Sequence, residues 1–124
     1  MSRDPITCHV LNTVTGKPAA GIACTILRQA GADFAPVGTA TTNGDGRVVT
    51  WETGAVPFAA AAAAVSGSTL FKVRFSEIDT YFGGDTFFPY VDVVFTVPEG
   101  KLGVEHFHIP LLLSRYSYST YRGS

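Results

Sequence analysis

The chain has 124 residues, of which 46% are hydrophobic and 15% charged, and its 9 basic and 10 acidic side chains give a net charge of −1. This size and composition predict one domain, residues 1–124, whose core buries roughly two thirds of the unfolded surface. The balanced charge argues against a nucleic-acid backbone or an anionic membrane as partner. The lack of a long apolar run and of a secretion signal leads us to expect a location inside the cell.

Short segments with the two-residue alternation of β-strands fill most of the chain. Strands are expected, in chain order, at 6–12, 22–29, 34–41, 47–51, 69–75, 91–97, 106–113 and 116–122. The first two are separated by turn residues, and we expect them to pair with each other, as we do the last two. Eight strands of this kind predict an all-β sandwich of two sheets.

One short helix is expected between the strands, over Ser76–Phe82, with Ser76 as its cap and Gly83–Gly84 at its end. The alanine run Ala59–Ala64 has good helix propensity but is too short to be stable alone. We interpret it as a surface insertion. A membrane or partner contact is the weaker alternative, because alanine adds little apolar area.

The densest turn signal is Asn43-Gly44-Asp45-Gly46. It approaches the spacing of a calcium-binding loop, but Thr41 stands where that loop has aspartate, and its flanks have the pattern of strands. We therefore expect a β-turn that places Arg47 at the start of a strand. There its planar guanidinium could hold a carbonyl, carboxylate or imide through two hydrogen bonds, although a solvated arginine is the simpler alternative.

The two cysteines, Cys8 and Cys24, are too few for a disulfide scaffold and lack zinc-ligand spacing. We expect both to be buried free thiols, because free cysteine behaves as a small hydrophobe.

Three histidines are candidates for chemistry. His106 and His108 are two residues apart in an expected strand, so they share one face of it. If that face meets His9, the imidazoles form a cluster able to exchange protons near neutral pH. Two alternatives stay open at this point: ordinary surface or hydrogen-bonded histidines, and a zinc ion held by all three rings.

The last nine residues, Tyr116–Ser124, are rich in hydroxyl groups and aromatic rings. Chain ends usually fray unless something holds them. This tail therefore either docks on the domain or forms a solubilising stub.

Three blocks of the sequence resemble the 5-hydroxyisourate hydrolase branch of the transthyretin-like family. They are His9–Asn12 with Gly16–Ala19, then Thr42–Arg47, and then His106–Ser114 continuing to Tyr121–Ser124. Phe87-Phe88-Pro89 also fits the pattern. The Tyr-Arg-Gly-Ser ending is specific to the hydrolases, since the hormone-carrying transthyretins lack it.

The resemblance implies an eight-stranded, transthyretin-like two-sheet sandwich with one short helix, assembled as a homotetramer with active sites between dimers. It implies hydrolysis of 5-hydroxyisourate to 2-oxo-4-hydroxy-4-carboxy-5-ureidoimidazoline in urate degradation, without cofactor or metal. By position, the catalytic residues are His9, Arg47 and His108. The substrate-binding residues are Tyr121, Arg122, Gly123 and Ser124, whereas His106 is not counted as catalytic.

Two features limit what the resemblance implies. Arg115 stands where many relatives have proline, which leaves the shape of the last turn in doubt. The ending Arg-Gly-Ser differs from the Ser-Lys-Leu peroxisomal signal, so a cytoplasmic and a peroxisomal location both remain open.

For the mechanism, we expect a neutral histidine, His108 with help from His9, to draw a proton from the water that attacks a ring carbonyl. Arg47 would hold the carbonyl edge and stabilise the developing negative charge. The alternatives are a transthyretin-type carrier of small aromatic ligands, a zinc-dependent cyclic amidohydrolase and a purely structural module. A carrier needs an apolar cleft, for which these three side chains are poorly suited.

Overall fold

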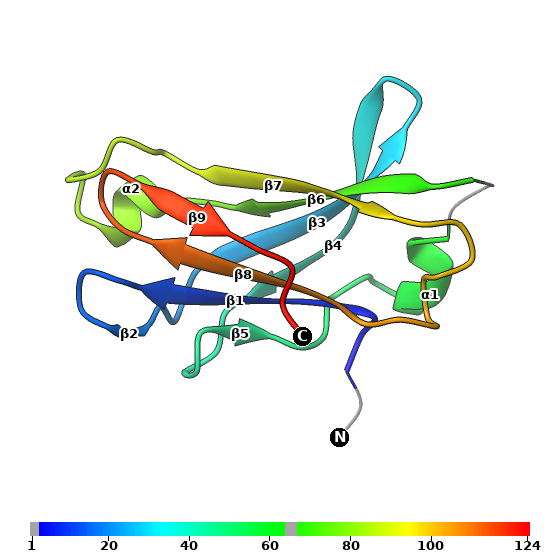
Figure 1. Ribbon diagram of the computed structural model, residues 1–124, viewed down its shortest axis with the longest axis horizontal. Coiled ribbons are helices and arrows are strands. Elements are labelled where there is room, and N and C mark those ends of the chain that lie inside the picture. Colours follow the sequence, from blue (N-terminus) through cyan, green and yellow to red (C-terminus); the bar gives the residue numbers. More distant parts are fainter. Residues whose placement is uncertain (1–2, 64–66) are drawn as a thin grey trace.

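Two β-sheets packed face to face form the fold in the computed structural model, which describes residues 3–63 and 67–124 (Figure 1). The first sheet contains, in spatial order, β2 (Lys17–Pro18), β1 (Ile6–Asn12), β8 (Phe107–Leu113) and β9 (Tyr118–Thr120), and β5 (Arg47–Val48) also pairs with β1. The second contains β4 (Asp33–Thr41), β3 (Ala23–Ala30), β6 (Thr69–Phe75) and β7 (Val91–Val97). The predicted all-β sandwich is therefore confirmed. The described residues form nine strands instead of the expected eight, because Lys17–Pro18, expected in a turn, pairs with β1 as the two-residue strand β2. The strand expected at 47–51 is shortened to the two residues of β5.

The expected pairing of the first two long strands is wrong. β1 pairs in parallel with β8 and antiparallel with β2 and β5, whereas β3 lies in the opposite sheet between β4 and β6. Alternation shows which face of a strand is apolar but not which strand lies beside it. Both strands turn an apolar face to the same core from opposite sheets, and this is why their patterns look alike. The expected pairing of the last two strands is confirmed.

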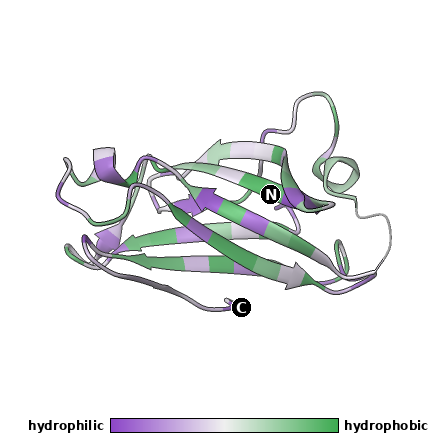
Figure 2. Cartoon of the chain, turned by 90° about the horizontal axis from the view of Figure 1, so that it is seen from above, coloured by the Kyte–Doolittle hydropathy of each residue, from purple (hydrophilic) through white to green (hydrophobic). Residues whose placement is uncertain are grey.

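The core follows the alternation of the strands, which appears as hydrophobic and hydrophilic bands along them (Figure 2). In β6, for example, Phe71, Val73 and Phe75 are buried while Lys72 and Arg74 between them are partly exposed. Cys8 and Cys24 are buried and free, as predicted. The faces that point away from this core are therefore the places where polar side chains gather.

The expected short helix is present as α2 (Ile78–Tyr81). Its cap differs from the prediction, because Glu77, with a φ of 56°, occupies the N-cap and no side chain caps the helix. Gly83 and Gly84 end it as expected, since both have positive φ and the Gly84 amide donates to the Asp79 carbonyl at 2.7 Å.

The alanine run contributes a second helix, α1 (Phe58–Ala61), in addition to the single one predicted. Phe58 and Ala62 are buried in the core, so this segment is more than a surface insertion; Ala64 lies outside the described residues. Phe58 at the start of the helix supplies the apolar area that the alanines lack. Within the described residues, no helix has both the length and the apolar character needed to cross a membrane.

Arg115 defines the shape of the last turn, which the sequence left in doubt. Its Nη1 lies 3.3 Å from a carboxylate oxygen of Asp85, and its guanidinium lies 5.2 Å from the centre of the Phe82 ring. The Phe87 amide also donates to the Arg115 carbonyl at 2.9 Å. The turn between β8 and β9 is thereby tied to the loop that follows α2.

Candidate active site

A cleft of about 430 Å³ opens on the face of β1, β5 and β8 that points away from the core. Its lining includes His9, Arg47, His106, His108, Tyr121 and Ser124. These residues come from the start, the middle and the end of the chain. Sheet pairing brings them together, because β1 lies between β5 and β8.

The turn before β5 puts Arg47 in the cleft. The Asn43 side-chain oxygen accepts hydrogen bonds from the amides of Asp45 at 2.9 Å and Arg47 at 3.0 Å, so the segment is a turn, as expected. Gly46 has a φ of 74°, and a β-carbon there would stand 2.5 Å from the Val10 carbonyl oxygen. Only glycine allows the turn to approach β1 so closely.

His9 and Arg47 are directly opposite each other in the antiparallel register of β1 and β5. Directly opposite side chains lie on the same face of a sheet and are close neighbours. The guanidinium and the imidazole therefore share one end of the cleft.

The three imidazoles lie in a row. The ring centres of His9 and His108 are 6.4 Å apart, and those of His108 and His106 are 6.1 Å apart, with interplanar angles below 30°. The predicted common face of His106 and His108 is thus present, and it meets His9. His108 is the middle ring, next to both of the others.

Burial and nearby positive charge keep these rings neutral. Burial, followed by the positive charge of Arg47, lowers the pKa of His108 to about 4, and the neighbouring histidines and Arg3 add to the shift. The same two leading causes lower the pKa of His9, although a hydrogen bond to the Asp45 backbone opposes them. At pH 7 both rings are neutral, and each has one bare nitrogen able to accept a proton.

The C-terminal tail docks against the cleft. The Gly123 amide donates to the His108 carbonyl at 2.9 Å, and the Thr120 hydroxyl donates to the Pro110 carbonyl at 2.7 Å. Of the two alternatives for the tail, docking or a stub, the structure therefore has docking. Tyr121 and Ser124 line the cleft, and Gly123 supports the His108 ring.

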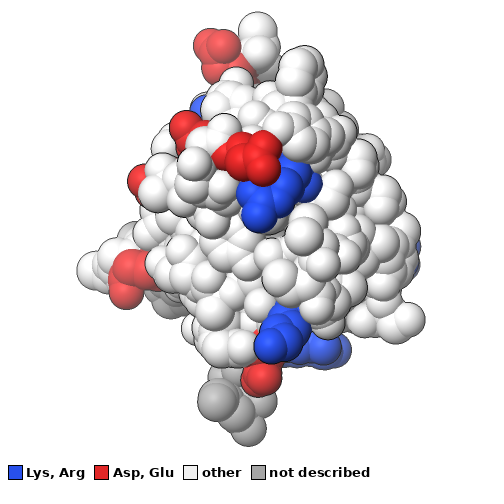
Figure 3. Space-filling view, turned by 90° about the vertical axis from the view of Figure 1, so that its left-hand side faces the viewer, with Lys and Arg blue, Asp and Glu red and all other residues white. Residues whose placement is uncertain are grey.

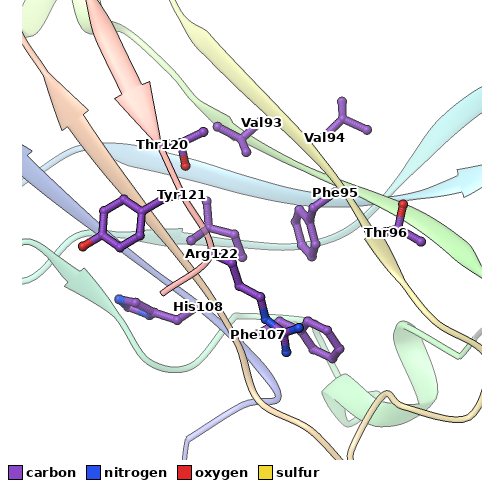
Figure 4. Close-up of a pocket in the computed structure, with 10 residues that line it drawn as sticks. Val93, Val94, Phe95, Thr96, Phe107, His108, Thr120, Tyr121 and Arg122 are labelled. Carbon is purple, nitrogen blue, oxygen red and sulfur yellow. The ribbon is translucent and has the colours of Figure 1, made fainter. Parts of the chain in front are cut away.

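Arg122 points elsewhere. Its guanidinium lies over the Phe107 ring, 4.9 Å from the ring centre, and its Nη2 lies 3.1 Å from a Glu105 carboxylate oxygen. This places it in an adjoining groove of about 270 Å³ between β7 and β8, which shares His108 and Tyr121 with the cleft (Figure 4). Of the four predicted tail residues, Tyr121 and Ser124 line the cleft, whereas Arg122 and Gly123 do not.

Among the cleft residues that sequence reasoning missed, two have polar side chains, Thr7 and Arg3. The Thr7 hydroxyl lies 2.9 Å from His106 Nε2 and 2.7 Å from His108 Nδ1, so it bridges the two rings. The one available signal was its position two residues before His9, on the same strand face. That signal has no meaning until β8 is known to be the neighbouring strand.

The zinc alternative finds no support in the geometry. Among residues 3–63 and 67–124, no three His, Cys, Asp or Glu side chains lie close enough together to hold a metal ion. One ring nitrogen each of His106 and His108 is instead engaged by the Thr7 hydroxyl.

Charge on the face at the α2 end of the molecule is sparse and mixed. Figure 3 shows basic side chains beside acidic ones on a surface that is mostly uncharged. This distribution agrees with the net charge of −1. This face therefore has no cluster of basic side chains that could bind a polyanion.

Comparison with known proteins identifies the family that shares this fold and these motifs. The chain is 38% identical over 131 residues to a 5-hydroxyisourate hydrolase of Deinococcus radiodurans, a match that covers 100% of both proteins. It is 37% identical to the uric acid degradation bifunctional protein TTL of Arabidopsis thaliana, covering 99% of this chain but 38% of that longer protein. The crystal structure of transthyretin from Sparus aurata superposes with a TM-score of 0.73 at 22% identity, covering 98% and 97% of the two chains, and shares the fold. Because the family model for the HIUase/Transthyretin family matches residues 6–123, the chain belongs to that family.

Proposed function

We propose that the protein hydrolyses 5-hydroxyisourate to 2-oxo-4-hydroxy-4-carboxy-5-ureidoimidazoline and thereby acts in urate degradation. The observation that carries this proposal is the convergence of His9, Arg47 and His108 in one cleft. It occurs in a chain that is 38% identical, over its full length, to a relative named for this activity. The substrate is thus a small molecule.

The chemistry follows from the two neutral imidazoles and the guanidinium. A ring carbonyl of the substrate is attacked by water, and a histidine takes the proton that the water loses. Arg47 holds the carbonyl edge and stabilises the negative charge that develops on its oxygen. Loss of a positioned acid or base typically costs about 10² to 10⁴ in rate, and loss of an oxyanion donor about 10² to 10³.

The carrier alternative is not favoured. Pockets for small ligands are usually apolar with few polar groups. This cleft contains three imidazoles and the guanidiniums of Arg3 and Arg47. Burying an aromatic ligand against so many polar groups without reacting with it would cost desolvation energy.

The direct test follows the ultraviolet absorbance of freshly generated 5-hydroxyisourate. We expect the protein to accelerate its decay, with or without a chelator, and His108→Ala and Arg47→Gln each to lose about 10²-fold or more of the rate. Arg74→Gln, an arginine in the opposite sheet, is the matched control and should retain full activity. Decay no faster than in buffer would refute the hydrolase and favour the carrier.

We further propose that the protein assembles as a homotetramer. β7 and β9 each end their sheet, and the exposed Val94 and Tyr118 lie on them. Open strand edges with apolar side chains are favourable surfaces for pairing with a second copy. Light scattering should give a mass four times the 13.2 kDa of one chain, and Val94→Lys should reduce it. A single-chain mass for the unmodified protein would refute the assembly.

A further inference from the structure

The Thr7 hydroxyl lies between two imidazoles. Its Oγ1 is 2.9 Å from His106 Nε2 and 2.7 Å from His108 Nδ1, and the residue is only 3% exposed. The parallel register of β1 and β8 places Thr7 opposite His108. A hydroxyl has a single hydrogen, so Thr7 can donate to one ring only and must accept from the other.

The other ring nitrogen of His106, Nδ1, determines which group donates in each of these two hydrogen bonds. His106 Nδ1 is buried and has no hydrogen-bond partner among the residues the structure describes. A buried N–H group without an acceptor is rarer in proteins than an acceptor without a donor. The one proton of the neutral His106 ring is therefore on Nε2, where it donates to Thr7 Oγ1.

Thr7 must then donate its own hydrogen to His108 Nδ1. The neutral His108 ring consequently has a bare Nδ1 and a protonated Nε2. No described residue hydrogen-bonds His108 Nε2, and the ring lines the cleft. Nε2–H is thus the group that His108 offers to a bound molecule.

We propose that Thr7 is a positioning residue that, with His106 as its hydrogen-bond donor, holds His108 in the tautomer with Nε2–H in the cleft. His108 then acts as a neutral hydrogen-bond donor, and the base is His9. This reverses the leading role that the sequence suggested for His108. The catalytic part of the inference rests on the proposed hydrolysis, whereas the tautomer does not.

The proton balance of the reaction fits these roles. The water oxygen bonds to the carbonyl carbon while His9 takes one water proton, and the charge on the carbonyl oxygen is stabilised by Arg47 and His108 Nε2–H. The C–N bond then breaks, and His9 returns that proton to the leaving nitrogen. His108 keeps its proton throughout, so no imidazolate anion is needed. A neutral imidazole serving as such a donor has precedent in enzymes.

The tautomer can be tested without substrate, by ¹⁵N NMR of ring-labelled histidine at pH 8. At this pH, above the ordinary histidine pKa, all three rings are neutral. Single His→Gln variants at positions 9 and 106 assign the signals. We expect His108 to have a protonated Nε2 and a bare Nδ1, and the Nδ1–H form to appear in Thr7→Val. A protonated Nδ1 in the unmodified protein overturns the proposal, whether or not 5-hydroxyisourate is hydrolysed.

The kinetic test compares Thr7→Val with Thr7→Ser. The valine variant lacks the hydroxyl, and its kcat should fall by about 10-fold to 100-fold with KM nearly unchanged, because the donor acts on charge that develops in the transition state. Serine retains the hydroxyl and should restore kcat to within about 3-fold of the unmodified value. Thr25→Val makes the same exchange in β3 and should leave kcat unchanged. An unchanged kcat in Thr7→Val, or no rescue by Thr7→Ser, overturns the catalytic role. A protein that does not hydrolyse 5-hydroxyisourate but has the expected NMR signals refutes the proposed function alone.

Discussion

The backbone of Gly123 lies directly against the imidazole of His108. A β-carbon at Gly123 would stand 2.6 Å from His108 Cδ2 and 3.2 Å from His108 Cβ. Real β-carbons essentially never come within 3.0 Å of such an atom, so the first of these two distances cannot be accommodated without a shift. The last residues of the chain therefore act as a wall that holds the His108 ring from one side, while Thr7 holds Nδ1 from another.

Gly123→Ala should lower kcat/KM for 5-hydroxyisourate by about 10²-fold. The added methyl group must displace either the tail or the His108 ring, and a displacement of about 1 Å can cost this much in rate. Stability should change little, because the neighbouring tail residues Tyr121, Arg122 and Ser124 are exposed to solvent. Kinetics and thermal melts of Gly123→Ala and of the exposed Ser119→Ala control would test this. Full activity in the first variant would show that the wall has no role.

Arg47→Gln should raise the pH below which kcat/KM begins to fall, called the acid limit here. The positive charge of Arg47 helps to lower the pKa values of His9 and His108, so its removal lets both rise toward the ordinary value of about 6.5. In the unmodified protein, kcat/KM should stay level from pH 8 to below 6.5. A pH profile of the residual activity measures the shift, and Arg74→Gln should leave the limit where it is. An unmoved limit in Arg47→Gln would contradict the electrostatic coupling.

Stability should fall on acidification between pH 6.5 and about 4. His108 has a pKa of about 4 in the folded protein, below its ordinary value of 6.5, so in this window the unfolded chain binds a proton that the folded protein does not. The lowered pKa values of His9 and His106 act in the same direction. Urea unfolding at several pH values should show a smaller decrease for His108→Gln than for the unmodified protein. An equal decrease in the free energy of unfolding for both proteins would indicate that His108 has its ordinary pKa in the folded protein.

Thr42→Val should destabilise the fold by about 2–4 kcal/mol. The buried Thr42 hydroxyl donates to the Ala19 carbonyl at 2.7 Å and accepts from the Ile22 amide at 2.9 Å. Valine has nearly the same shape but leaves both backbone groups unpaired in the core. Thr42→Ser keeps the hydroxyl and should cost less than about 1.5 kcal/mol. Denaturant unfolding of the two variants separates the contribution of the hydrogen bonds from that of packing. An equal loss of unfolding free energy in both variants would argue against the hydrogen-bond role.

Much of the site could be found from the sequence because its signals are local. The two-residue period alone places His106 and His108 on one face of β8, and the dense turn signal places Arg47 at the start of β5. The resemblance assigned His9, Arg47 and His108 to catalysis and the end of the tail to substrate binding. Thr7 could not be found in this way, because threonine is common in strands and acquires a role only from its two partners, about 100 residues away.

The sequence by itself determined the all-β class and the apolar face of each strand, because these depend on residue type and short-range period. Its motifs carried the resemblance to the HIUase/Transthyretin family, whose model matches residues 6–123. Only the tertiary structure decided that β1 lies beside β8 and not beside β3. Parallel pairing of the two ends of a chain leaves no local signal, since it is selected by burial of both apolar faces in one core. That pairing sets His9, Thr7 and His108 side by side and makes a cleft from residues that are remote in sequence.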